Sequence, residues 1–230
     1  GPLTLVLKRD PRVPDAVTGG QDTVALRVPA HPLTHALLAR FGGGIAAPSA
    51  NRYGHISPTT PDHVREEFGA ETPFLLDGGP ATGGIESTIV GCLEASPRIL
   101  RPGLVSATAI TAATGLEVAR APGAHAQPRT AGQDVSHYAP RTPALLVERA
   151  DRPAPAARVG YLGFDAPAIP VARDLRLPGD PTAAARVLYS SLRELDAAGL
   201  DLILVQRPPP GPEWAGVRDR LERATARSRP

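Results

Sequence analysis

The chain has 230 residues, which is enough for one large domain or two small ones, each with its own hydrophobic core. No run of about 18 apolar residues occurs, so no membrane-spanning segment is predicted, and the single cysteine, Cys92, excludes an internal disulfide and favours a reducing, cytoplasmic compartment with the thiol in the core. The formal net charge is only +2 and nearly all basic residues are arginine, so charge alone identifies no partner.

Residues 1–118 alternate strand-like and helix-like segments, which is typical of a layered α/β domain. Alternation in residues 23–28 predicts a strand with Val24, Leu26 and Val28 on its core face. Pro32 predicts the first turn of a helix that runs to about Phe41. The other predicted elements are a helix at 61–68 and strands at 3–7, 45–49, 74–76, 87–90 and 98–100.

Residues 119–142 are predicted to form a linker, because prolines and glycines interrupt any periodicity there. A second, smaller α/β domain is expected over residues 143–230. Its predicted elements are a strand at 159–162, a helix from Asp180-Pro181 to Gly199, a strand at 201–205 and a helix from Trp214 to about Ala224. This order suggests a small Rossmann-like domain, although no G-x-G-x-x-G sequence indicates dinucleotide binding.

Polar side chains stand at predicted strand ends, where ligands of α/β sheets commonly bind. Ser49 and Asn51 are two residues apart in an extended segment, so both would point to one side, but an ordinary polar turn gives the same pattern. Thr23 and Arg27 are expected on one strand face, about 13 Å apart. Arg27 could bind a carboxylate there or form a structural ion pair.

Two further polar residues and several absent motifs narrow the chemistry. Ser87 precedes a strand, where hydroxyls more often cap a turn, and Arg101 follows one, where it could reach a phosphate. The chain has no Walker loop, no H-E-x-x-H sequence, no paired cysteine ligands and no G-x-S-x-G elbow. Its six histidines lack the spacing of a zinc site. Neither a metal site nor a catalytic nucleophile is therefore predicted.

Taken in order, these segments are far more specific than any one of them. They are Pro2-Leu3-Thr4, the strand at 23–27 with Pro29 and His31-Pro32, Ala46-Ala47-Pro48-Ser49-Ala50-Asn51, Ser57-Pro58-Thr59, Leu76-Asp77-Gly78-Gly79-Pro80, Gly84-Ile85-Glu86-Ser87-Thr88, Leu100-Arg101-Pro102-Gly103 and His137-Tyr138-Ala139-Pro140. Together they strongly resemble the YrdC-like threonylcarbamoyl-AMP synthases in their longer, two-domain form. The resemblance implies a YrdC-like twisted sheet layered with helices, followed by the small Rossmann-like domain.

The resemblance also implies an activity, that of an L-threonylcarbamoyladenylate synthase. This nucleotidyltransferase joins L-threonine, bicarbonate and ATP, with Mg²⁺ at the phosphates, and releases pyrophosphate; the product feeds a downstream threonylcarbamoyl transferase complex that makes threonylcarbamoyladenosine in tRNA. The positions that match ATP-binding residues are Thr23, Ser49, Asn51, Ser57, Arg101 and Tyr138. Those that match threonine-binding residues are Arg27, Ala47 (through its backbone) and Ser87. Adenylation needs positioning and charge compensation rather than a protein nucleophile, and Tyr138 would belong to a lid that excludes water.

Departures from the family pattern affect the expected activity. The family's K-x-R sequence, which contacts the ATP phosphates, would precede Gly1 and is absent, so we expect an N-terminally truncated and catalytically impaired chain. Residues 130–135 replace the family's usual Ser-Pro-Gly-Met run, which puts the lid contacts there in question. Tyr53 stands where a small residue is common and is expected to alter loop packing only.

Two other functions are considered. One is a non-catalytic module that binds tRNA or other double-stranded RNA, but the basic residues are not clustered and aromatic side chains that could stack on bases are few. RNA binding that survives replacement of Arg27 and Ser49 would favour it. The other is a carbamoyl transferase of the hydrogenase-maturation type, against which the His-Tyr-Ala-Pro sequence and the terminal α/β domain argue.

Overall fold

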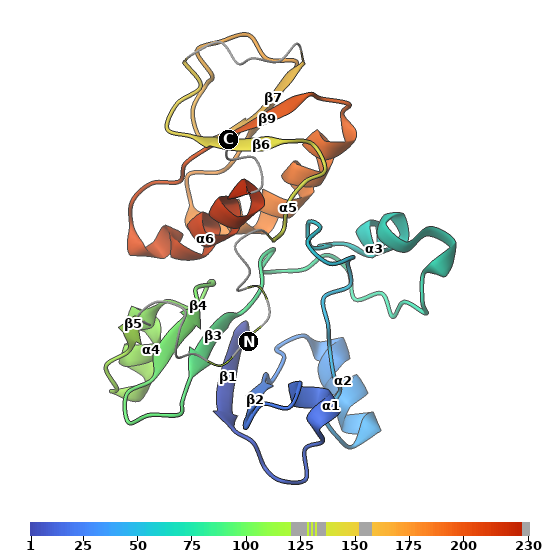
Figure 1. Cartoon of the computed structure of the whole chain (residues 1–230), viewed down its shortest axis with the longest axis vertical. Coiled ribbons are helices and arrows are strands. Elements are labelled where there is room, and N and C mark those ends of the chain that lie inside the picture. Colours follow the sequence, from blue (N-terminus) through green and yellow to red (C-terminus); the bar gives the residue numbers. More distant parts are fainter. Residues whose placement is uncertain (121–127, 129, 131, 133–136, 152–157, 227–230) are drawn as a thin grey trace. The chain divides into compact units, whose positions relative to one another are not determined.

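Figure 1 shows the computed structural model of the chain, which describes residues 1–120, 128, 130, 132, 137–151 and 158–226. The fold divides into two compact units, each built from two stretches of chain. Unit 1 comprises Gly1–Pro48 and Glu86–Gln133, and unit 2 comprises Ser49–Ile85 and Asp134–Pro230. Unit 2 therefore contains a segment from the middle of the first predicted domain.

Unit 1 contains a mixed five-stranded sheet in the order β2-β1-β3-β4-β5. The strands are β1 (Leu3–Lys8), β2 (Thr23–Leu26), β3 (Thr88–Gly91), β4 (Arg98–Arg101) and β5 (Ala119–Arg120). Strand β1 pairs antiparallel with β2 and parallel with β3, so residues more than 80 positions apart become neighbours. The helices are α1 (Asp15–Thr18), α2 (Pro32–Phe41) and α4 (Ala107–Thr114). Val6, Ile89 and Val90 are buried in the sheet.

The C-terminal part of unit 2 is a parallel four-stranded sheet in the order β6-β9-β7-β8. The strands are β6 (Ala144–Val147), β7 (Val159–Gly163), β8 (Arg173–Arg176) and β9 (Leu202–Gln206). The two central strands are buried along their whole length, as is usual where both faces of a parallel sheet are covered. The helices are α5 (Pro181–Ala197) and α6 (Ala215–Ala224), the latter preceded by the short helix η3 (Pro212–Trp214).

Helix α5 follows directly from its sequence. The Asp180 carboxylate accepts a hydrogen bond from the Ala183 amide, and Pro181 occupies the first turn, where its missing N–H costs nothing. Leu188, Leu192 and Leu195 of its apolar stripe are completely buried. The helix can therefore present the residues beside this stripe at fixed positions.

The middle segment, residues 49–85, carries the helices α3 (Pro61–Phe68) and η1 (Gly69–Glu71). The Thr60 hydroxyl caps α3 by accepting from the His63 amide at 3.2 Å. At its end Gly84 has φ +73° and passes so close to α5 that a Cβ there would overlap the backbone of Ala185 and Arg186. Only glycine fits this approach.

Most predicted elements are confirmed, and two are wrong. Residues 45–49 and 74–76 contain no strand, although both read as short apolar strands. Ile45 and Phe74 are exposed, and neither segment pairs with a neighbouring strand among the described residues. A short apolar run becomes a strand only where a partner supplies the ladder of hydrogen bonds. Helices α1 and α4 and strands β5, β6 and β8 are additional to the prediction.

Two burial predictions also need correction. On β2 only Val24 is buried, whereas Leu26 is 52 % and Val28 72 % exposed, because β2 is an edge strand that ends at Leu26. Cys92 is half-buried rather than in the core, and burial raises the pKa of its thiol. Across the ranges that the structure describes, every helix is too short or too polar to traverse a membrane.

Candidate functional site

The residues singled out by the sequence fall into both units. Unit 1 contains the three predicted threonine-binding residues, Arg27, Ala47 and Ser87, together with Thr23 and Arg101. Unit 2 contains the other four predicted ATP-binding residues, which are Ser49, Asn51, Ser57 and Tyr138. The two sets are described separately.

In unit 1 the sheet brings Ser87 and Arg101 together with Thr4. The Thr4 and Ser87 hydroxyl oxygens are 2.7 Å apart, and Arg101 donates to the Ser87 carbonyl from Nη2 at 3.0 Å and from Nε at 3.2 Å. Ser87 is 4 % and Arg101 5 % exposed. The structure thus places a guanidinium charge against the backbone of a predicted threonine-binding residue. We call these three residues the Ser87 cluster.

The turn after β4 is fixed against β3 by close packing. Thr88 is fully buried; its hydroxyl donates to the Val105 carbonyl at 2.8 Å and accepts from the Val105 amide at 3.1 Å. A Cβ at Gly103 would overlap the Thr88 backbone. Glycine in the Arg-Pro-Gly sequence is therefore required by the close approach of two backbones, and this approach fixes the strand end that carries Arg101.

Thr23, Arg27 and Ala47 lie outside the Ser87 cluster. Thr23 begins β2, opposite Lys8, while Arg27 and Ala47 are exposed. Arg27 forms no ion pair with another described residue. Among the described residues, no hydrogen bond joins Thr23, Arg27 or Ala47 to the Ser87 cluster.

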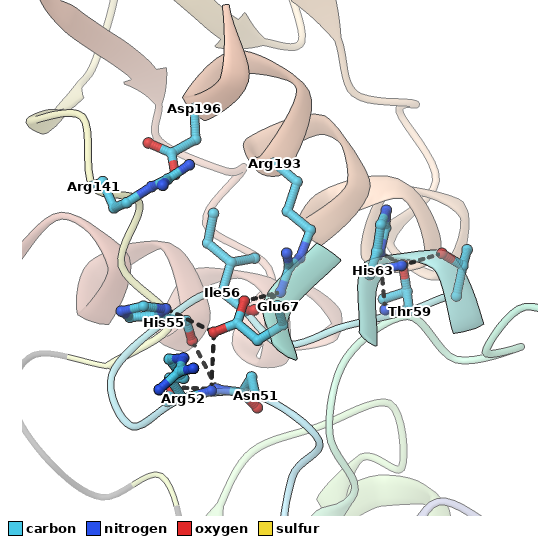
Figure 2. Close-up of polar contacts among 11 residues, drawn as sticks. Asn51, Arg52, His55, Ile56, Thr59, His63, Glu67, Arg141, Arg193 and Asp196 are labelled. Carbon is cyan, nitrogen blue, oxygen red and sulfur yellow. Dashed lines mark hydrogen bonds and ion pairs between the residues drawn. The ribbon is translucent and has the colours of Figure 1, made fainter. Parts of the chain in front are cut away.

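In unit 2 Asn51 shapes the loop in which it lies, residues 49–57, which we call the S-x-N loop. Its Nδ2 donates to the carbonyls of Arg52 at 2.9 Å and His55 at 3.2 Å, and two carbonyl acceptors fix the orientation of the amide (Figure 2). Its Oδ1 is buried and accepts no hydrogen bond from the described residues. Ser49 is exposed, and Ser57 is buried.

A buried carboxylate, Glu67 of α3, holds this loop. Its Oε1 accepts from the Arg52 amide at 2.9 Å and lies 2.7 Å from His55 Nδ1, and its Oε2 lies 3.2 Å from Arg193 Nη2 (Figure 2). Burial raises the pKa of Glu67, but the hydrogen bonds from Arg52, His55 and Arg193 outweigh it and leave the pKa lowered. Glu67 is therefore a carboxylate at neutral pH.

A pocket of about 270 Å³ lies beside this carboxylate within unit 2. Its polar lining includes Arg52, His55, Glu67, Arg141, Arg193 and Asp196. Arg141 pairs with Asp196 at 3.3 Å, so the pocket contains charges of both signs (Figure 2). Among the described residues, no group of three or more His, Cys, Asp or Glu side chains is placed to hold a metal ion.

Ala139, the neighbour of Tyr138, joins the S-x-N loop to the rest of unit 2. The Ala139 amide donates to the Gly54 carbonyl at 2.9 Å, so sequences about 85 positions apart lie side by side. The Tyr138 ring is 2 % exposed and packs against His137, Tyr189 and the Arg220 guanidinium. Its φ of +60° is unusual for a residue other than glycine. Most of the predicted linker, 119–142, lies outside the described residues.

Sequence reasoning gave no site role to Glu67, Arg193 or Thr4, although Thr4 belongs to one of the segments that carry the resemblance. A signal for Arg193 exists, because it stands beside the apolar stripe of α5 yet carries a charge, and its side chain is only 14 % exposed. A charged residue next to a buried stripe needs a partner, but the sequence does not say which.

Two family models match successive parts of the chain. Residues 1–103 match a family model described as "Telomere recombination" and residues 105–226 match one described as "Threonylcarbamoyl-AMP synthase, C-terminal domain". A threonylcarbamoyl-AMP synthase of Pyrococcus abyssi is 33 % identical over 245 residues, covering 98 % of this chain and 70 % of the relative. The chain belongs to the threonylcarbamoyl-AMP synthase family.

Other members of the threonylcarbamoyl-AMP synthase family give the same picture. The Bacillus subtilis relative is 34 % identical over 244 residues, covering 97 % of this chain and 69 % of the relative. The crystal structure of P. abyssi Sua5 complexed with L-threonine superimposes with a TM-score of 0.87 at 32 % identity, covering 99 % of this chain and 71 % of that one. The predicted family and the two-domain α/β fold are therefore confirmed.

The threonylcarbamoyl-AMP synthase family models and the compact units divide the chain differently. Residues 49–85 lie within the range of the first family model but cluster in space with the second. The S-x-N loop thus contacts helix α5 of the C-terminal family domain through Arg193.

Proposed function

We propose that the protein is an L-threonylcarbamoyladenylate synthase, which forms threonylcarbamoyl-AMP and pyrophosphate from L-threonine, bicarbonate and ATP. The observation that carries the proposal is that the similarity, in sequence and in fold, extends over nearly the whole chain. The relatives with similar sequences are named for this product. The relative of similar fold was solved with L-threonine. The RNA-binding alternative is not favoured by any of these relatives.

The threonine side of the reaction would use Arg27, Ala47 and Ser87. The exposed guanidinium of Arg27 can bind a carboxylate through two parallel hydrogen bonds. The Ser87 hydroxyl and the backbone of Ala47 would orient the amino acid. The buried charge of Arg101 beside Ser87 would favour an anionic substrate there, because a charge acts strongly where water is excluded.

The ATP side would use Thr23, Ser49, Asn51, Ser57, Arg101 and Tyr138. Attack of N-carboxythreonine on the α-phosphorus forms the P–O bond of the mixed anhydride and expels pyrophosphate. The protein's part is to align the reacting atoms and to offset negative charge. Tyr138 is buried and precedes Ala139, whose amide donates to the Gly54 carbonyl, so it would act beside the S-x-N loop.

Asn51 offers one oxygen, Oδ1, whose chemistry suits a hydrated Mg²⁺. Both hydrogen bonds from Nδ2 go to loop carbonyls, while the buried Oδ1 is an acceptor without a partner among the described residues. Mg²⁺ and its bound waters prefer oxygen partners. Asn51 Oδ1 would therefore hold a hydrated Mg²⁺, and the ion when bound would neutralise phosphate charge.

The finer assignments belong to the same proposal. Transfer of AMP would make the enzyme a nucleotidyltransferase, and its product would serve a downstream threonylcarbamoyl transferase complex that modifies tRNA. A labile mixed anhydride must be used close to where it forms, so we place the protein in the cytoplasm with that complex.

The test measures pyrophosphate released from ATP in the presence of bicarbonate, with and without L-threonine. Threonine-dependent release is expected, and Arg27→Ala should reduce it at least about 100-fold, since charge-assisted contacts contribute strongly to positioning. Arg40→Ala, which removes an arginine in the last turn of α2, is the matched control and should retain activity.

Calorimetric titration of L-threonine and of ATP gives a second readout that does not depend on turnover. If the protein fails to bind L-threonine, or fails to bind ATP, the proposal is overturned. The expectation of impaired turnover stays a prediction, and a turnover equal to that of the B. subtilis relative would contradict it.

A further inference from the structure

The S-x-N loop has almost no regular structure to hold it. Within residues 49–57 there is no helix, and His55 forms only an isolated bridge with Ala139. Inside the loop one backbone hydrogen bond is present, from the His55 amide to the Arg52 carbonyl at 3.1 Å. A loop of this kind takes its conformation from the side chains around it.

Glu67 supplies the main anchor. Glu67 Oε1 is hydrogen-bonded to both the Arg52 amide and the His55 ring. Two points of the loop are therefore bound to a single atom of α3. The Glu67 side chain is only 7 % exposed. A carboxylate so buried needs compensating charge to remain ionised.

Arg193 of α5 supplies that charge and a third attachment. Its Nη2 donates to the Ile56 carbonyl and lies 3.2 Å from the second Glu67 oxygen. Arg193 belongs to the range of the C-terminal family model, whereas the loop and Glu67 belong to the first. Figure 2 shows this guanidinium directed from α5 toward Ile56 and Glu67.

We propose that Arg193 is a positioning residue through which the C-terminal domain sets the affinity of the S-x-N loop for ATP, acting through Glu67 and the Ile56 carbonyl. The inference rests on the proposed function in taking ATP as the ligand of this loop. It assigns the C-terminal domain a direct part in nucleotide binding, carried by an arginine that does not itself touch the nucleotide.

The inference separates the two substrates. The predicted threonine-binding residues all lie in unit 1, and no hydrogen bond joins them to Glu67 or Arg193 among the described residues. Loss of Arg193 should therefore weaken ATP binding, by roughly 10- to 100-fold as for other residues that orient a binding group. Threonine binding should change less than about twofold.

The experiment compares Arg193→Ala and Arg193→Lys with the matched control Arg173→Ala. Arg173 pairs with Glu194, the neighbour of Arg193 on α5, but both side chains of that pair are about half exposed. The dissociation constants of Mg-ATP and L-threonine are measured by calorimetry on the whole protein, and hydrogen exchange is followed in a peptide covering the S-x-N loop. Arg193→Lys keeps the charge and a hydrogen-bond donor group but loses the planar guanidinium, so it should recover part of the ATP affinity.

The expected result is weaker ATP binding and faster exchange in the loop for Arg193→Ala, with α5 still protected and the control unchanged. Equal losses of ATP and threonine binding would indicate general unfolding and overturn the inference, as would unchanged loop exchange. Unchanged ATP binding in Arg193→Ala would overturn it while leaving the proposed function intact. If the unaltered protein binds no ATP, the proposed function fails and the inference fails with it.

Discussion

The Ser87 cluster and the S-x-N loop carry predicted binding residues in different ways. Ser87 and Arg101 stand at the ends of paired strands, and the turn beyond them is fixed by contact between two backbones at Gly103. The S-x-N loop is outside any sheet and is attached by the charged side chains Glu67 and Arg193.

This difference predicts different sensitivities. A group positioned by strand pairing tolerates changes in pH and salt, because backbone hydrogen bonds do not titrate. A loop positioned by a buried ion pair depends on both partners, since removal of one leaves the other charge buried without compensation. The following experiments, ordered by the size of their expected effect, test where this contrast holds.

Gly84→Ala should have the largest effect. It tests whether close backbone packing, which fixes the Ser87 cluster in unit 1, also fixes the middle segment in unit 2. The new methyl group would overlap the α5 backbone, and φ at this position is +73°. We expect a loss of about 3 kcal/mol or more in the free energy of unfolding. Gly79→Ala is the matched control, since its φ is +80° but no atom lies within 4 Å of the added Cβ.

The control should lose only about 1 kcal/mol, the cost of the left-handed backbone alone. Urea denaturation of both variants measures the difference. Equal losses would show that α5 moves aside at little cost, and that Gly84 is not a fixed point between the middle segment and α5.

Arg101→Ala tests the Ser87 cluster. The variant removes a buried guanidinium that donates twice to the Ser87 carbonyl, and hydrogen bonds from charged donors contribute about 1.5–3 kcal/mol. We expect a loss of about 2 kcal/mol in stability together with weaker threonine binding. Arg98→Ala, on the same strand, removes a more exposed pair with Glu94 and should cost less than about 1 kcal/mol. Similar losses of stability in Arg101→Ala and Arg98→Ala would contradict the prediction that the Arg101 contacts stabilise the Ser87 cluster more than an exposed ion pair does.

The sequence predicts elements whose signals are local. Helix α5 begins at its Asp180-Pro181 cap and α3 at Thr60-Pro61, both as expected. The segments 45–49 and 74–76 show the limit, because the same apolar pattern that forms β3 forms no strand without a partner. Pairing depends on chain segments elsewhere, which a local pattern does not contain.

The candidate site was predicted residue by residue through resemblance, but its supporting contacts were not. The bond from Arg101 to Ser87 depends on the register of β3 against β4, which shifts at Ile89. The pair of Arg193 with Glu67 joins residues 126 positions apart. Many carboxylates could partner Arg193 on charge alone, and only the packing of α5 against the middle segment selects one.

Glu67→Gln tests whether the S-x-N loop depends on a titratable side chain. The folded protein lowers the pKa of Glu67, so the carboxylate contributes stability above its unfolded value of about 4.3, and this contribution is lost as the pH falls through the lower folded value. At pH 7 the variant should be less stable by about 1 kcal/mol. The difference should vanish in acid. Glu71→Gln is the control, because its carboxylate is 75 % exposed, and a pH-independent difference for Glu67→Gln would contradict the prediction.

The smallest expected effect is a change in the titration of His63, which lies outside the S-x-N loop and reports the Arg193 charge. Burial, and then the positive charge of Arg193, lower the pKa of His63. The Thr59 amide donates to His63 Nδ1 at 3.2 Å, which requires a neutral ring and adds to the same preference. Since the folded state favours the neutral form, stability is greatest above the ordinary value of about 6.5 and decreases as the pH falls toward the lowered one.

Arg193→Ala should therefore raise the His63 pKa measured by NMR, whereas Arg173→Ala should leave it unchanged. Because burial is the larger cause, the pKa should remain below its ordinary value even in Arg193→Ala. A His63 pKa that does not respond would mean that the Arg193 charge is screened by solvent. The ion pair with Glu67 would then be too weak to distinguish the S-x-N loop from the sheet-bound Ser87 cluster.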